Sequence, residues 1–366
     1  MLTLISLSLL SGCTEYVAHR IVERRDNPKD VTELPPELDL VQSCIRIPVG
    51  PPDATLFCQV FEPRQHIVVT TKSEDVNEAR AIAKAKSPKG DYQVVYGWIT
   101  HEKNVEWIWT LLQMPAPKWR GTVILLHGDS GGVRSDKYLV PLASLLSDAG
   151  YRVVYLDLRA QGDSTGKYVN IGGRIDQKDF SQVLDYLQSH HLAGKSVIVI
   201  GISYGANVAP ALAAGDPRVA AAVCLSTGPS LLNFYATYHE GPYKEQMKRL
   251  YPLEYIFVLP WLSEEDWQKA ATRAGQLGDF DPDSAADSAV WITKTKVPVL
   301  LVHGTKDMNV PLSCSQRIQD ARPDNTTFIK YEGEDHSSYL PRDDFRQAVL
   351  AWLEKNFRQP VGCAGP

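Results

Sequence analysis

Three absences limit the classes of protein to which this sequence can belong. Its 38 Lys and Arg are outnumbered by 43 Asp and Glu, for a formal net charge of -5 over 366 residues, whereas nucleic-acid-binding proteins usually carry a basic patch or stripe. No uncharged apolar run is long enough to span a bilayer. No internal repeat or low-complexity tract occurs, which excludes solenoids and repeat arrays. We therefore expect no nucleic-acid partner and no transmembrane helix.

Clustered metal ligands are also absent. The sequence has 6 cysteines and 9 histidines, but it contains no Cys-x-x-Cys pair and no Cys/His cluster with ligand spacing. A structural zinc site usually needs four such side chains at short, regular spacings. We therefore expect neither a metal nor another cofactor.

The first ten residues, MLTLISLSLL, form a short apolar run. The run is too short for a membrane span and suits the core of a secretory signal, although no Lys or Arg precedes it. It leads into LSGC, which resembles the lipobox of bacterial lipoproteins, where the cysteine is lipidated. The resemblance implies a signal peptide over residues 1–13, lipidation of Cys13 and a lipid-anchored position in the cell envelope. Thr14 in place of an aspartate implies outer-membrane sorting, and the alternative is a buried N-terminal helix.

With the lipidated cysteine set aside, at least one of the remaining cysteines must stay unpaired. We expect a disulfide between Cys44 and Cys58, which lie in strand-like segments, and another between Cys314 and Cys363, which the C-terminal tail could bring together. Both would suit an oxidising compartment. Cys224 lies in the apolar run AAAVCLS, and we expect it to be a small buried hydrophobe.

From about residue 91 the sequence alternates between strand-like and helix-like segments. Continuous runs of Val, Ile and Leu are typical of strands buried on both faces, and between them apolar residues recur three or four apart, as they do on a helix. The runs occupy residues 121–128, 151–159, 195–203, 219–226, 297–304 and 325–333. This alternation predicts an α/β fold with a mostly parallel, doubly wound sheet. We expect DYQVVYGWIT and VEWIWTLLQMP to form a hairpin at its antiparallel edge.

Residues 14–90 are harder to interpret. Their first part is charged and contains prolines, which favours a tether or an irregular surface arm. The segment SEDVNEARAIAKAKS predicts one amphipathic helix. We treat the whole range as an N-terminal tether and extension, and its sequence indicates no particular function.

Two serines compete for the role of nucleophile. Ser130 lies in HGDSGG, which contains the motif around the nucleophile of chymotrypsin-like proteases. Those proteases have an all-β double barrel with a histidine and then an aspartate upstream of the serine, and the alternation described above argues against that fold. Ser203 lies in Gly-Ile-Ser-Tyr-Gly, directly after an apolar strand and directly before a helix-like segment. This is the context that G-x-S-x-G requires, so Ser203 is the predicted nucleophile.

A neutral serine needs a base and a group that orients the base. Asp307 follows the apolar run VPVLLVHG, and His336 follows the run TTFIKY. Both therefore lie in loops at the carboxyl edge of the predicted sheet, as Ser203 does. The order Ser203, Asp307, His336 is that of α/β-hydrolases and differs from chymotrypsin and subtilisin. We expect His336 to be the general base and Asp307 to orient it.

On these residues the chain resembles the α/β-hydrolase superfamily over about residues 91–358. His127-Gly128 after a strand also matches the family, and DLRAQGDS is similar to its D-x-R-G-x-G-x-S loop, with Ala160 in place of one glycine. The resemblance implies an oxyanion hole made by the backbone amides of Tyr204 and Asp129. The acidic side chain of Asp129 would have to turn away from the oxyanion.

The lengths of the remaining segments suggest how the rest of the chain is organised. Residues 228–292, between two predicted strands, are too long for an ordinary connection and predict a helical cap over the site. The cap is rich in aromatic residues, some of which we expect to line an apolar substrate pocket. Residues 359–366 form a C-terminal tail.

The resulting hypothesis is a lipid-anchored serine hydrolase that cleaves a carboxylic ester through an acyl-enzyme. Fold and triad do not specify the leaving group, so a peptidase of the dipeptidyl-peptidase or acyl-peptidase type is the alternative. A third hypothesis is a surface lipoprotein whose hydrolase body serves as a non-catalytic scaffold. The substrate is a small-molecule ester or a peptide, and the oligomeric state is left open.

Overall fold

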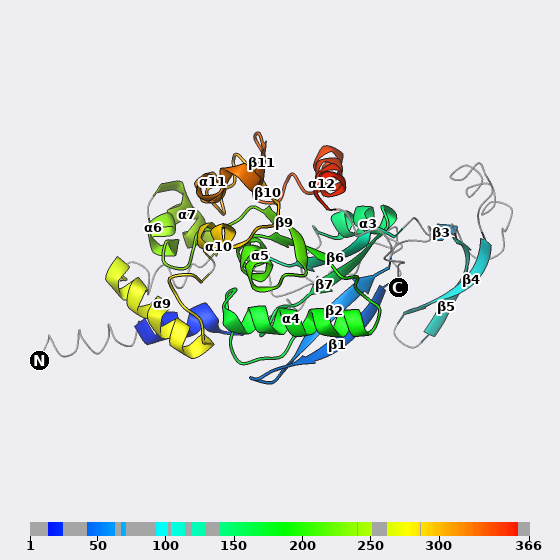
Figure 1. Cartoon of the computed structure of the whole chain (residues 1–366), viewed down its shortest axis with the longest axis horizontal. Coiled ribbons are helices and arrows are strands. Elements are labelled where there is room, and N and C mark those ends of the chain that lie inside the picture. The colour runs from blue at the N-terminus through cyan, green and yellow to red at the C-terminus, as the bar shows by residue number, and fades with distance from the viewer. Residues whose placement is uncertain are drawn as a thin grey trace, which may run out of the picture.

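The main body of the protein is an eight-stranded sheet with helices on both faces (Figure 1). The computed structural model describes residues 14–24, 42–62, 67–70, 93–101, 104–113, 119–128, 139–239, 241–250, 262–285 and 287–357. The strand order of the large sheet is β1-β2-β7-β6-β8-β9-β10-β11. The mostly parallel, doubly wound α/β architecture predicted from the sequence is confirmed.

Six neighbouring strands of this sheet are parallel. They are β6 (Gly121–Leu126), β7 (Tyr151–Leu156), β8 (Val197–Ile202), β9 (Val219–Leu225), β10 (Val299–Gly304) and β11 (Thr326–Tyr331). Every residue of β6, β7, β8 and β10 is buried. This burial explains their continuous apolar sequences, because helices cover both faces of a parallel sheet.

Alternate side chains of each strand enter two separate cores. On β6, Val123 and Leu125 pack with α3 (Val140–Asp148) and α12 (Asp343–Asn356). Ile124 and Leu126 pack on the other face with α4 (Arg174–Ser189) and α5 (Tyr204–Gly215). The helices α10 (Ser288–Lys294) and α11 (Leu312–Ala321) complete this second layer, and the short η3 (Pro323–Asn325) leads into β11. The period of two along a strand therefore produces the two-layer packing.

The antiparallel edge of the large sheet differs from the prediction. The expected hairpin forms as β4 (Gln93–His101) and β5 (Asn104–Gln113), but it belongs to a separate three-stranded sheet with β3 (Ile67–Thr70). The edge of the large sheet is instead made by β1 (Gln42–Val49) and β2 (Ala54–Phe61), and β2 pairs antiparallel with β7. A boundary near residue 90 thus does not separate the N-terminal extension from the main body.

A helix over residues 14–22 replaces part of the expected tether. One face of it, formed by Val17, Ala18, Ile21 and Val22, is buried against the region between β9 and β10. That region contains the helices α6 (Phe234–His239), α7 (Gly241–Leu250) and α9 (Glu264–Gly278), and Figure 1 shows the N-terminal helix beside α9. The expectation of an irregular arm is wrong for these residues, because the charged sequence has an apolar face at helical spacing. The predicted helix SEDVNEARAIAKAKS lies outside the described residues.

The predicted Cys44–Cys58 disulfide is not formed. In the register of β1 and β2, Cys44 lies opposite Gln59 and Cys58 lies opposite Ile45. The two thiols therefore point to opposite faces of the sheet, and Cys44 is exposed whereas Cys58 is buried. Cys314 is also a free thiol in the structure, and Cys363 lies outside the described residues.

Cys224 is fully buried in the core that α5 covers, as expected of a small hydrophobe. Burial raises the pKa of its thiol to about 12.

Among the described residues, none of the helices has the length and hydropathy needed to cross a bilayer. Residues 1–13, which contain Cys13, lie outside the described ranges.

Candidate active site

The three residues predicted as nucleophile, acid and base follow strands at one edge of the large sheet. Ser203 follows β8, Asp307 lies in the loop after β10, and His336 lies in the loop after β11. These strands belong to the run β8-β9-β10-β11 of parallel neighbours. Because the chain leaves parallel strands at their carboxyl ends, the three loops gather where open α/β sheets usually bind ligands.

Ser203 has a strained backbone. Its φ of 51° and ψ of -112° place it in a region that residues with a side chain rarely adopt. It lies between the last residue of β8 and the first residue of α5, and its amide donates a 2.8 Å hydrogen bond to the carbonyl of Leu225. Strain of this kind is concentrated at functional sites. The sharp turn predicted from G-x-S-x-G is present.

The two glycines of the motif are required by close backbone contacts. A Cβ on Gly201 would lie 2.2 Å from the carbonyl oxygen of Gly205. A Cβ on Gly205 would lie 2.6 Å from the carbonyl oxygens of both Leu126 and His127, and the Gly205 amide donates to the His127 carbonyl at 3.0 Å. The obstructing atoms are backbone, so no side-chain rotation could make room. Glycine at both positions lets α5 start directly against β6 and β8.

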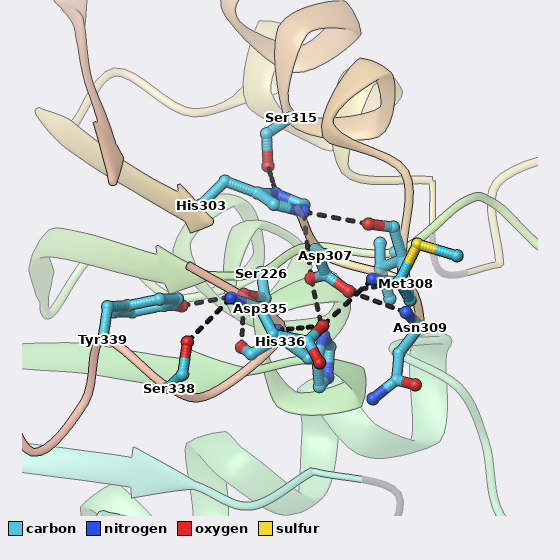
Figure 2. Close-up of polar contacts among 12 residues, drawn as sticks. Ser226, His303, Asp307, Met308, Asn309, Ser315, Asp335, His336, Ser338 and Tyr339 are labelled. Atoms are coloured by element: carbon cyan, nitrogen blue, oxygen red, sulfur yellow. Dashed lines mark hydrogen bonds and ion pairs between the residues drawn. The ribbon is translucent and has the colours of Figure 1, made fainter. Parts of the chain in front are cut away.

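Asp307 and His336 form a hydrogen-bonded pair (Figure 2). His336 Nδ1 lies 2.7 Å from Asp307 Oδ2; the Asp307 side chain is fully buried and that of His336 is 16% exposed. The other oxygen, Oδ1, accepts from the amides of Asn309 at 2.8 Å and Val310 at 2.7 Å. Burial acts to raise the pKa of Asp307, but hydrogen bonds from His303 and His336 outweigh it and hold the pKa at about 2. Asp307 is therefore a carboxylate at neutral pH.

A second histidine, which the sequence analysis did not single out, contacts the same carboxylate oxygen. His303 lies on β10 and is fully buried, with Nε2 3.1 Å from Asp307 Oδ2. Its Nδ1 lies 2.7 Å from Ser315 Oγ on α11 (Figure 2). The available signal was the spacing His-x-x-x-Asp in HGTKD at the end of an apolar strand. That spacing alone does not reveal that the two side chains are buried together.

The loops that carry the acid and the histidine are fastened to each other. The Asp335 carboxylate accepts from the amides of Met308 at 3.0 Å and His336 at 2.7 Å, so it joins the loop after β10 to the loop after β11. A Cβ on Gly304 would lie 2.4 Å from the carbonyl oxygen of Glu334, which shows how closely the loops approach. Asp335 thus holds the loops together and does not replace Asp307 as the partner of the imidazole.

Two helices of the predicted cap contact the loop after β10, which carries Asp307 and is called the acid loop from here on. Tyr238 on α6 donates a 2.7 Å hydrogen bond to the carbonyl of Asn309, and Tyr243 on α7 donates a 3.4 Å hydrogen bond to the carbonyl of Asp307. The predicted cap therefore approaches the site through aromatic side chains. The aromatic residues of the predicted cap within residues 251–261 lie outside the described ranges.

Ser203 and His336 are both held at the end of β9. The amide of Ser203 is bonded to the carbonyl of Leu225, and the hydroxyl of the next residue, Ser226, donates to the carbonyl of His336 at 2.8 Å. In the part of the chain that the structure describes, no hydrogen bond joins the Ser203 hydroxyl to the His336 imidazole. The structure brings Asp307 and His336 into contact and places Ser203 beside the same strand end.

The predicted oxyanion donors are only partly described. Tyr204 is the first residue of α5, so its amide lies at the N-terminal end of that helix. Asp129 and Ser130 lie outside the described residues, so the role of the Asp129 amide stays a prediction. Within the described ranges, no group of three or more His, Cys, Asp or Glu side chains is arranged to hold a metal ion.

Sequence comparison relates these features to known proteins. Residues 123–351 match the model of the alpha/beta hydrolase family. Over 256 residues the chain is 25% identical to a 2-hydroxy-6-oxononadienedioate/2-hydroxy-6-oxononatrienedioate hydrolase of Klebsiella pneumoniae. The aligned region covers 64% of this chain and 87% of the relative.

Solved structures of low sequence identity share the fold. An esterase of Pyrococcus furiosus matches with a TM-score of 0.59 at 18% identity, covering 91% of this chain and 98% of the esterase. A puromycin-hydrolyzing peptidase of Mycobacterium tuberculosis matches with a TM-score of 0.51 at 17% identity, covering 90% of this chain and 42% of the peptidase. At these identities the likeness concerns the arrangement of helices and strands alone.

Proposed function

Since the chain belongs to the alpha/beta hydrolase family, we propose that it is a serine hydrolase that cleaves a carboxylic ester through an acyl-enzyme on Ser203. The observation that carries the proposal is the combination of a strained serine between β8 and α5 with a buried aspartate–histidine pair at the same sheet edge. Backbone strain at a turn costs stability, so it is usually retained where function needs it. Together they supply what a serine nucleophile requires.

The chemistry follows from the atoms that are engaged. His336 uses Nδ1 to hold Asp307, so Nε2 is the ring nitrogen that remains to act on the serine. Nε2 takes the proton of Ser203 as its oxygen attacks the ester carbonyl, and it returns the proton to the departing alcohol. Asp307 remains a carboxylate and stabilises the imidazolium that forms. Water then hydrolyses the acyl-enzyme by the same route, with His336 again as the base.

The tetrahedral intermediate carries a negative oxygen that needs donors. The Tyr204 amide at the start of α5 provides one, and the positive end of the helix adds to it. We assign the second donor to the Asp129 amide by similarity to the family. This assignment requires the Asp129 carboxylate to point away from the oxyanion.

The fold and the proposed triad do not determine whether the leaving group is an alcohol or an amine. The alternative is a peptidase, because the same acyl-transfer machinery cleaves amides when the site accepts the amine. The fold is shared with an esterase and with a peptidase, which does not favour either reaction. The contacts of Tyr238 and Tyr243 with the acid loop support an aromatic, partly apolar wall for the acyl or alcohol part of an ester.

The test is covalent labelling with a fluorophosphonate. The wild-type protein should bind one probe per chain, and Ser203→Ala should abolish labelling and lower ester turnover by about 10⁴-fold or more. Ser130→Ala is the control and should keep both labelling and turnover. Labelling that survives in Ser203→Ala and disappears in Ser130→Ala would overturn the assignment of the nucleophile.

A substrate panel separates the alternatives. Turnover of short p-nitrophenyl esters without turnover of aminoacyl-arylamides supports the esterase, and arylamide turnover supports the peptidase. A protein that neither labels nor turns over any substrate would favour the scaffold hypothesis over both enzymes.

A further inference from the structure

We propose that His303 is a positioning residue: by holding Oδ2 of Asp307, it sets the direction and the basicity of the His336 imidazole. The inference rests on the proposed function, because it concerns the base of that site. His303 acts through Asp307 and not on the reacting atoms.

The contacts of His303 determine which of its nitrogens carries a proton. Nε2 lies 3.1 Å from Asp307 Oδ2 and 3.1 Å from the carbonyl oxygen of Val310. A carboxylate and a carbonyl can only accept, so Nε2 is the donor. Nδ1 lies 2.7 Å from the hydroxyl of Ser315, which can donate or accept. The ring therefore joins the acid loop to α11 with both nitrogens satisfied in a fully buried place.

Two imidazoles share one carboxylate oxygen. Asp307 Oδ2 lies 2.7 Å from Nδ1 of His336 and 3.1 Å from Nε2 of His303. Each donor stabilises part of the negative charge, so the His303 donor reduces the charge that attracts a proton to His336. It also prevents the carboxylate from turning, and this fixes the line along which His336 presents Nε2. Loss of the His303 donor should make His336 more basic and less well directed.

Other titratable groups around the pair do not compete for this effect. Three of them interact with Asp307, and burial raises the pKa of each, so they stay neutral near neutral pH: Tyr243, Cys314 and Tyr339. Glu334 and Asp335 adjoin His336 in the chain, and Asp335 is occupied by two backbone amides. None of these groups changes in the variants considered next, so a shift in the titration of His336 reports on His303.

The experiment compares two amide variants of His303 that keep different halves of its contacts. His303→Gln places an amide N–H where Nε2 was and keeps a donor to Asp307, whereas His303→Asn reaches only the Nδ1 position and keeps the contact with Ser315. The titration midpoint of His336 is measured by NMR in the resting protein, and kcat and KM are measured against pH. Ser315→Ala is the matched control, because it removes the far contact of the ring and leaves the donor to Asp307.

We expect His303→Asn to move the His336 midpoint and the acid limb of kcat/KM upward by about one pH unit. The same variant should lower kcat about tenfold with little change in KM. His303→Gln and Ser315→Ala should stay close to wild type in all three measurements. An unchanged His336 midpoint in His303→Asn, or a shift in His303→Gln that His303→Asn lacks, would overturn the inference.

The two proposals fail separately. The NMR titration needs no turnover, so it can also be carried out in Ser203→Ala protein. Ester turnover that persists in Ser203→Ala would refute the proposed nucleophile while leaving the coupling of His303 to His336 measurable.

Discussion

Asp307 is the residue at which the polar contacts of the site converge. Its Oδ1 receives two backbone N–H groups and its Oδ2 receives two imidazoles, so all of its hydrogen bonds are to donors that favour the charged form. Removing a carboxylate from water is costly unless such donors replace the water. Here they more than compensate, and the pKa of Asp307 falls from 3.8 to about 2. The residue proposed to orient the base should therefore also contribute to the stability of the fold.

This contribution should depend on pH in a defined direction. The pKa of Asp307 in the folded protein, about 2, is below the ordinary value of 3.8, so its stabilisation is complete above the ordinary value and is lost as the pH falls toward 2. Asp307→Asn should lower the free energy of unfolding by about 2 kcal/mol at pH 6. The difference from wild type should shrink by about half at pH 3.

Urea unfolding at both pH values measures this difference. The control is Asp324→Asn, which removes an exposed carboxylate in η3. This residue lies at the amino end of β11, whereas the site lies at the carboxyl ends of the strands. A stability gap for Asp307→Asn that is equal at pH 6 and pH 3 would contradict the role assigned to its charge.

At the scale of elements, the N-terminal helix and the cap stabilise each other. A helix as short as residues 14–22 is marginal in water by itself. Its buried positions Val17, Ala18, Ile21 and Val22 follow helical spacing and pack in one cluster with Trp267 and the alanines of α9. The surface ion pair of Glu15 with Arg273 adds little, because both side chains are exposed. Apolar contact with this cluster, which also contains Val169 and Ile171, therefore contributes more to holding the helix than the ion pair does.

A charge in this contact should separate the two elements. Val22→Asp places an unpaired carboxylate at a position with no solvent exposure, at a cost of at least about 2 kcal/mol. Hydrogen exchange followed by mass spectrometry should show faster exchange in residues 14–24 and in α9, while β6 and β8 stay protected. Tyr16→Asp is the control, because Tyr16 is 46% exposed. Equal exchange in α9 for both variants would show that the helix does not support the cap.

At the scale of the whole molecule, the position of this helix determines how an anchor would orient the protein. Residue 14 begins the helix that packs on the cap, and the proposed lipidation site, Cys13, directly precedes it. We propose that lipid on Cys13 holds the protein in the cell envelope with the cap side nearest the bilayer. The support for lipidation itself is the LSGC pattern after a short apolar run.

Detergent partitioning tests whether lipid on Cys13 anchors the protein. The full chain expressed in a bacterium should enter the detergent phase of Triton X-114, and Cys13→Ser should move it to the aqueous phase without changing ester turnover per molecule. Mass spectrometry of the first peptide should find the acyl groups on Cys13. Cys44→Ser is the control, since Cys44 is exposed but lies on β1. Equal partitioning of wild type and Cys13→Ser would refute the anchor.

Prediction from the sequence was successful where local pattern controls local structure. The apolar runs formed the buried strands, and G-x-S-x-G formed a strained turn between β8 and α5 because glycine is needed on both sides of it. Prediction failed where a contact joins distant segments. β2 pairs with β7 although about ninety residues separate them, and the register of β1 against β2 turns Cys44 away from Cys58.

The sequence by itself determined the class of fold and the order of the chemical groups along the chain, because hydrophobic period and turn glycines act within a few residues. Only the tertiary structure decided the electrostatics of the site, since the state of Asp307 depends on burial and on donors from three separate segments: its own loop, β10 and the loop after β11. For the same reason His303 looks like an ordinary strand residue in the sequence. Its contact with Asp307 exists only after β10, α11 and the loop after β11 have packed together and excluded water.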